Sequence, residues 1–268
     1  MIDRGRHNVL GVMVNALDYE AAVAQVASAG HARRPLAVSA LAVHGIMTGV
    51  FDAEHRYRLN ALDLVVPDGQ PVRWALNRLH RTALTDRVYG PTLMLKACEK
   101  AATEGLPVFL FGGSESLQKT LQKKLVERFP KLQIAGGQAS KFRQLAPEER
   151  DQTVAHIQAS GAAITFVGLG CPKQEVWAYE FRDALSMPIL AVGAAFNFHA
   201  GLLPQAPRWM QTSGLEWFYR LAEEPRRLWR RYLLLNPLYV SMLMLQAMRL
   251  RAFNPAHTIE PKRELRYG

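Results

Sequence analysis

Cysteine is scarce in this chain of 268 residues, which contains only Cys98 and Cys171 and no CxxC pair. Two isolated thiols cannot build a disulfide framework or a cysteine-based zinc site, so the composition favours a reducing compartment. The N-terminus has no charged segment followed by a long apolar core. We therefore expect no signal peptide and a cytoplasmic protein.

Several catalytic motifs are also absent. The chain has no GxxxxGK[ST] phosphate loop, no GxSxG nucleophile elbow and no DxD pair. It has no His/Cys/Asp cluster with the spacing of metal ligands either, so we expect no metal and no cofactor. A nucleotide diphosphate bound here would have to be held by arginine, lysine and helix N-termini.

Positive charge is abundant but unevenly distributed. The net charge is +10, and residues 201–268 contain eleven Lys and Arg against five Glu, a surplus of six. Phospholipid, a diphosphate or a nucleic acid could meet this end of the chain.

Short apolar runs alternate with longer amphipathic segments over the first three quarters of the chain. The expected strands are Val9–Val14, Leu36–Ser39, Leu62–Val66, Pro107–Phe111, Gln133–Ala135, Ala163–Val167 and Ile189–Val192. Helices are expected at 114–129, where Leu and Phe recur every four residues behind Ser114, and from Pro147 onwards. The alternation predicts an α/β core (1–205) with a mainly parallel sheet flanked by helices. For residues 206–268 the sequence predicts a helical, Arg-rich appendage.

Ligands of parallel α/β sheets bind where strands end and helices begin. Asp68 follows the expected strand 62–66 and is either a general base or a helix N-cap. Gly112, Gly113 and Ser114 form a glycine turn at a helix N-terminus, which favours an anion site. In 196–201, Asn197 and His199 could face a site or be structural.

Residues 167–175 read Val-Gly-Leu-Gly-Cys-Pro-Lys-Gln-Glu, another glycine turn before a helix. Gly168 and Gly170 match the start of a dinucleotide fingerprint, but Lys173 occupies the position of the next glycine, and the strand 189–192 lacks the ribose-binding acid. Lys173 and Gln174 either face a ligand or form a solvated first turn.

Arg220, Arg227 and Arg230 are spaced by seven and three residues, which we interpret as one helical face suited to a diphosphate, although Pro225 should interrupt the helix. A solvated basic face is the alternative. The apolar run 232–248 is short for a membrane span and contains Pro237, so it is either an interfacial segment or a packed core helix.

In this order, the motifs resemble those of the WecG/TagA/CpsF family of bacterial glycosyltransferases. The matching segments are Pro67–Gly69, Arg87–Gly90, Leu110–Gly113, Val167–Glu175, Ala206–Trp209 and Leu215–Tyr232. Together they place the resemblance over roughly residues 9–232.

The resemblance implies a Rossmann-like core and an inverting, metal-independent hexosyltransferase in cell-surface polysaccharide (exopolysaccharide) synthesis. The implied donor is a UDP-sugar of the N-acetylmannosamine, N-acetylmannosaminuronic acid or glucose class, and the implied acceptor is a glycan on undecaprenyl diphosphate at the inner face of the plasma membrane. Asp68 would be the base. The implied substrate-binding residues are Ser39, His44, Arg87, Gly112, Gly170, Lys173, Gln174, Asn197, Arg220, Arg227 and Arg230.

The chain departs from the family pattern in two places. Ser39 and Leu41 stand where the family commonly has Thr-x-Asn, with His44 as a nearby substitute for the lost amide, and Asn197 stands where many members have Asp. Two other classes remain: a nucleotide-cofactor oxidoreductase or methyltransferase, and a basic protein that binds nucleic acid or membranes. The interleaving of arginine with apolar residues favours a lipid surface over nucleic acid.

Overall fold

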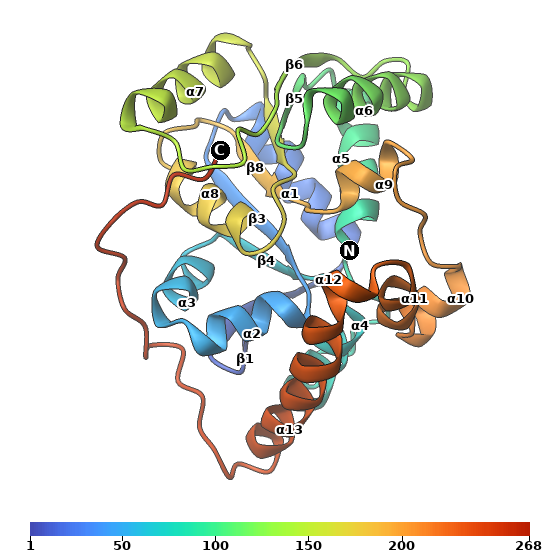
Figure 1. Ribbon diagram of the computed structural model, residues 1–268, viewed down its shortest axis with the longest axis vertical. Coiled ribbons are helices and arrows are strands. Elements are labelled where there is room, and N and C mark those ends of the chain that lie inside the picture. Colours follow the sequence, from blue (N-terminus) through green and yellow to red (C-terminus); the bar gives the residue numbers. More distant parts are fainter.

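The computed structural model describes residues 1–268 and contains a six-stranded parallel sheet in the order β4-β3-β8-β7-β5-β6. The strands of this sheet are β3 (Leu36–Leu41), β4 (Leu64–Pro67), β5 (Val108–Phe111), β6 (Ile134–Gln138), β7 (Ile164–Val167) and β8 (Pro188–Ala191). Each corresponds to an expected strand. The α/β fold class with a parallel, Rossmann-like sheet is therefore confirmed, and Figure 1 shows the helices on either side of it.

Alternate residues of each strand enter two separate cores, because successive side chains point to opposite faces of a sheet. One core holds Val108 and Leu110 of β5, and the other holds Phe109 and Phe111. The helices of the first core are α1 (Tyr19–His31), α5 (Gly90–Glu104), α6 (Glu115–Arg128) and α9 (Ala195–His199). Those of the second core are α2 (Val43–Phe51), α3 (Ala53–Asn60), α4 (Gln70–His80), α7 (Pro147–Ala159) and α8 (Lys173–Phe181).

The two helices predicted from their capping signals are present. Ser114 caps α6 by accepting the Leu117 N–H at 3.2 Å, and α7 begins at Pro147. In α6, Leu117, Leu121 and Leu125 are buried, so the four-residue apolar repeat faces the sheet.

The first expected strand, 9–14, is wrong. The chain forms an antiparallel hairpin of β1 (Asp3–Val9) and β2 (Val12–Leu17), and a two-residue turn lies inside the apolar run. Leu10 and Gly11 have φ angles of 55° and 89°, as a tight hairpin turn of the type I′ kind requires. Both Val9 and Val12 are fully buried, so hydrophobicity alone does not reveal the turn.

The last quarter of the chain is helical to Ala247 and contains no strand element. It comprises α10 (Arg208–Ser213), α11 (Glu216–Glu223), α12 (Pro225–Trp229), the π-helical turn η1 (Arg230–Leu234) and α13 (Leu235–Ala247). In α13, Tyr239 is only 1% exposed and its hydroxyl donates to the Pro71 carbonyl at 3.2 Å, so this helix packs on the core. None of the helices combines the length and the apolar character that a membrane crossing requires.

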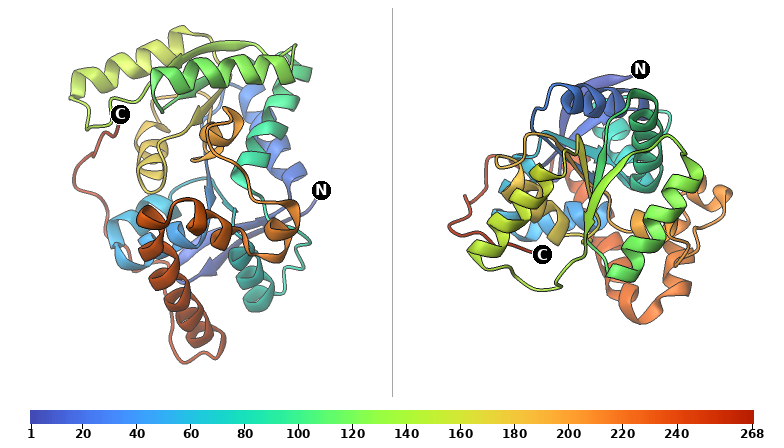
Figure 2. Two further views of the ribbon diagram at one scale, coloured as in Figure 1. Left: turned by 45° about the vertical axis from the view of Figure 1, so that its right-hand side comes forward. Right: turned by 90° about the horizontal axis from the view of Figure 1, so that it is seen from above.

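Residues 248–268 are not helical and return over the core as an extended segment, which we call the tail. Figures 1 and 2 show it running from the far end of α13 past α3 towards α7. The expected appendage is thus helical only in part.

Candidate functional site

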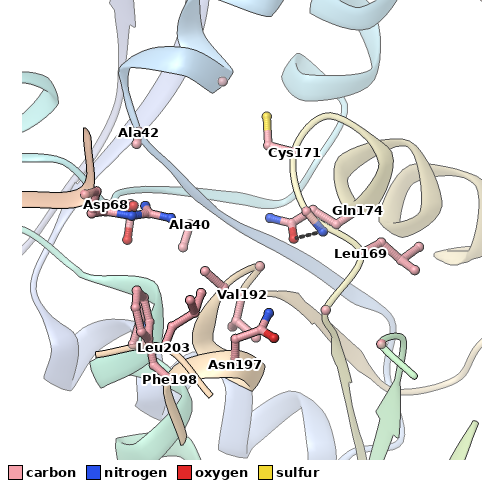
Figure 3. A pocket seen from close by; sticks show the side chains of 18 of the residues that line it. Ala40, Ala42, Asp68, Leu169, Cys171, Gln174, Val192, Asn197, Phe198 and Leu203 are labelled. Atoms are coloured by element: carbon pink, nitrogen blue, oxygen red, sulfur yellow. Dashed lines mark hydrogen bonds between the residues drawn. The ribbon is translucent and has the colours of Figure 1, made fainter. Parts of the chain in front are cut away.

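A cavity of about 600 Å³ opens at the carboxyl ends of the sheet strands. The loops after β3, β4, β5, β7 and β8 each contribute to its wall, as expected for an open parallel sheet. Figure 3 shows Asp68 on one side of the cavity and Gln174 and Leu169 on the opposite side.

Asp68 lies at the junction of this cavity and a smaller one of about 90 Å³. Its Oδ1 accepts the Gly90 N–H at 2.6 Å, and its Oδ2 makes no hydrogen bond within the protein. Burial raises the pKa of Asp68 to about 6, against the lowering effect of Arg87. Asp68 does not cap α4, because the N-cap is Gly69 and no side chain bonds the first turn. The N-cap alternative is therefore wrong.

Arg87 and Glu216 form a buried ion pair beside Asp68, with 2.5 Å between Nη2 and Oε2. The Arg87 guanidinium also lies over the Tyr89 ring, 4.2 Å from its centroid. Arg87 lines the smaller cavity, whereas Tyr89 lines the larger one. Glu216 belongs to α11, so this pair joins the appendage to the core.

Residues 168–174, the loop after β7 and the first residues of α8, form the opposite wall. Gly170, with a φ of 79°, donates its N–H to Gln174 Oε1 at 3.1 Å. The Gln174 Nε2 in turn donates to Glu175 Oε1 at 2.9 Å, and Ser39 Oγ donates to the same oxygen at 3.0 Å. Gly170 and Gln174 line the cavity, but Ser39 is fully buried behind it and supports Glu175.

Several backbone N–H groups of the expected anion site are hydrogen-bonded within the protein. The N–H groups of Gly168, Gly170 and Gln174 all have protein acceptors. Gly112 does not line the cavity; a Cβ there would lie 2.9 Å from the Gly168 backbone, so this glycine is needed for close packing of two loops. Lys173 also points elsewhere, with Nζ 5.4 Å from the centroid of the Tyr267 ring.

Three arginines of the appendage line the cavity, namely Arg220, Arg227 and Arg231. Of the expected set of Arg220, Arg227 and Arg230, only Arg230 does not line the cavity. Its side chain is exposed and lies against Trp229. Arg220 lies in α11, Arg227 in α12 and Arg231 in η1, and the backbone leaves helical angles at Glu224, between α11 and α12. The expected single helical face is therefore wrong, and the interruption expected from Pro225 is present.

Arg231 was not among the residues expected from the sequence. Its Nε is buried and has no hydrogen-bond partner in the protein. A buried guanidinium nitrogen without an acceptor is costly, and an anion in the cavity would satisfy it. Glu175 and Glu216 were also not assigned a role, although both belong to the quoted motifs.

The remaining expected residues divide between the two cavities. Asn197 lines the larger one, while His199 is structural and contacts the Pro91 carbonyl at 2.8 Å. His44 lines the smaller cavity, and burial lowers its pKa to about 4, so it is neutral at pH 7. Leu41, at the position of the missing amide, is buried at the wall of the larger cavity.

The model of the Glycosyl transferase WecG/TagA/CpsF family matches residues 7–253 of this chain. Since this match covers most of the chain, the protein belongs to that family and is a glycosyltransferase.

Proposed function

We propose that this WecG/TagA/CpsF glycosyltransferase transfers a sugar from a UDP-sugar to a polyprenyl-diphosphate-linked acceptor, with inversion at the anomeric carbon. The observation that carries the proposal is the cavity itself, in which a basic carboxylate and three arginines face one space. Its volume of about 600 Å³ is in the range of small-molecule sites.

Asp68 is the proposed base. With a pKa of about 6, it is ionised at pH 7 but more basic than an ordinary aspartate. Gly90 holds Oδ1, which leaves Oδ2 to take the proton of the acceptor hydroxyl. The hydroxyl oxygen then forms a bond to the anomeric carbon while the bond from that carbon to the diphosphate breaks. UDP leaves from the opposite face.

The arginines would neutralise the leaving group. Arg220, Arg227 and Arg231 come from the appendage and face the cavity, and guanidinium groups match phosphate oxygens in geometry and charge. Arg227 also contacts Glu224 Oε2. Gln174, fixed by Gly170 and Glu175, presents an oriented amide to the donor from the other wall.

The acceptor is proposed to be lipid-linked because apolar side chains are exposed on the appendage. Leu233, Leu234, Met244 and Met248 are each more than half exposed, and the exposed Arg230 and Arg249 flank this run in sequence. This combination suits an anionic membrane surface. We accordingly propose residues 206–268 as a membrane-associating appendage and a peripheral location at the inner face of the plasma membrane.

The experiment is transfer from a panel of UDP-sugars to a short-chain polyprenyl-diphosphate-linked glycan, with the Asp68→Asn variant as control. We expect turnover with one UDP-sugar, and a loss of about 10²- to 10⁴-fold in the variant with donor binding retained. Near-normal turnover by Asp68→Asn at saturating donor would falsify the assignment of the base. Transfer from a non-uridine nucleotide sugar would contradict the proposed donor.

A further inference from the structure

The tail returns to the core and is bonded along its length. The Asn8 Nδ2 donates to the Phe253 carbonyl at 2.6 Å, and the Ile259 N–H donates to the Ala53 carbonyl at 3.2 Å. The tail therefore crosses the hairpin and α3 in a defined path (Figure 1).

Beyond α3 the tail is bonded to α8. Glu180 Oε1 and Oε2 accept the N–H groups of Leu265 and Arg266 at 2.7 and 2.8 Å. Burial raises the pKa of Glu180, and these two backbone donors lower it, so they compensate a carboxylate that has lost part of its water. Such a pair of charge-assisted bonds fixes this part of the tail.

The last residues pair with the loop between β6 and α7. The Leu145 N–H donates to the Arg266 carbonyl at 2.7 Å, and the Ser140 hydroxyl donates to the Gly268 carbonyl at 2.6 Å. Gln144 and Tyr267 form an antiparallel bridge. This loop thus adopts its conformation together with the tail.

The same loop forms one end of the main cavity. Phe142 lines the main cavity and also a small cavity of about 40 Å³ behind it, which Tyr267 and Gly268 close. Leu169 and Gly168 are likewise shared by the two cavities. Tyr267 and Gly268 are therefore separated from the main cavity only by the residues that form its wall.

We propose that Tyr267 is a positioning residue of the donor site: it holds the Phe142 loop and the Leu169 loop in place at the end of the cavity that receives the donor nucleoside. This inference rests on the proposed function. Asp68 marks the reacting side of the cavity and Leu169 lies on the opposite side (Figure 3), so we place the donor nucleoside at the wall formed by Leu169 and Phe142.

Two features make Tyr267 the residue to test. Its ring receives the Lys173 ammonium at 5.4 Å from the centroid, which ties the tail to the first turn of α8. It also lies beyond residue 253, where the family match ends, so its contribution is separate from the family motifs. The ring, not the hydroxyl, makes the contact with Lys173.

The experiment compares the unmodified protein with Tyr267→Ala, Tyr267→Phe and Arg263→Ala. Arg263 is an exposed residue of the same tail and serves as the matched control. UDP affinity is measured by calorimetry, donor and acceptor KM and kcat by transfer, and exchange of the 140–146 amides by mass spectrometry. A lost cation–π contact is expected to weaken UDP binding and raise the donor KM about two- to fivefold, with acceptor KM and kcat unchanged.

We expect Tyr267→Phe and Arg263→Ala to behave as the unmodified protein and exchange at 140–146 to rise only in Tyr267→Ala. Faster exchange with unchanged UDP affinity would make the tail a stability element alone and overturn the proposal. Unchanged exchange together with unchanged affinity would overturn it as well. If the unmodified protein failed to bind UDP, the proposed function would fail first, and this inference with it.

Discussion

Replacing Asp68 by asparagine removes a charge while keeping the size of the side chain and an oxygen that can accept the Gly90 N–H. In the folded protein, burial raises the pKa of Asp68 from an ordinary value of 3.8 to about 6. A difference of about two pH units corresponds to roughly 3 kcal/mol of penalty on the ionised form. Because the side chain borders a cavity open to water, we expect about 1 to 3 kcal/mol to be recovered in Asp68→Asn.

The sign of this effect depends on pH. Below about pH 4, Asp68 is protonated in both the folded and the unfolded chain, and the variant gains nothing. Between pH 4 and 6 the unfolded chain ionises first, so the folded state loses stability relative to it as the pH rises. Above about pH 6 the full penalty is present. Asp68→Asn should therefore be more stable than the unmodified protein at pH 7.5 and equally stable near pH 4, while being nearly inactive.

Thermal unfolding at both pH values measures the effect, with Asp183→Asn as the exposed control. For a chain of this size we expect the melting temperature to rise by about 2 to 4 °C per kcal/mol. A gain that is the same at both pH values, or a loss of stability at pH 7.5, would show that Asp68 is not a destabilised carboxylate. Its assignment as a base of raised pKa would then lose its physical foundation.

The other predictions concern the appendage. Arg231→Ala should raise the donor KM about tenfold or more, whereas Arg230→Ala should change it less than about twofold; equal effects in transfer kinetics would contradict the assignment of the cavity arginines. Glu216→Ala should lower the free energy of unfolding by about 3 to 5 kcal/mol in urea titrations, because it leaves its arginine partner buried and unpaired. The same change should shift the acidic limb of the kcat/KM profile to lower pH, since Glu216 raises the pKa of the base; a shift to higher pH would be inconsistent with that coupling. Leu234→Glu combined with Leu238→Glu should abolish flotation with anionic phospholipid vesicles and leave UDP binding intact. Retained flotation would contradict the proposed membrane-binding surface. Tighter binding of the unmodified protein to duplex DNA than to vesicles would contradict it as well.

Most of the sheet could be predicted from the sequence because buried parallel strands are short, continuous apolar runs. The runs around Val65, Leu110 and Phe166 each gave a strand near its observed place. The run 9–14 failed for a physical reason: its two-residue turn depends on backbone angles at Leu10 and Gly11, and apolar periodicity carries no information on those angles.

In the candidate site, the positions at strand ends were predictable and the side-chain directions were not. Asp68 and Gln174 follow apolar strands, so their place at the cavity follows from the rule for parallel sheets. Lys173 adjoins Gln174 in sequence but points to Tyr267, a residue 94 positions away, and only the path of the tail explains that direction. Arg231 lies in η1, beyond the break at Glu224, so helical spacing counted from Arg220 does not identify it either.

The ion pair of Arg87 and Glu216 shows that the candidate site depends on the position of the appendage. Glu216 raises the pKa of Asp68, Arg87 and Arg220 lower it, and burial at their junction raises it most. Glu216 and Arg220 both belong to α11, so the basicity of Asp68 depends on that helix being docked against the core. If the appendage moved away, Asp68 would lose this burial together with both α11 charges, and its pKa would return towards that of an ordinary carboxyl.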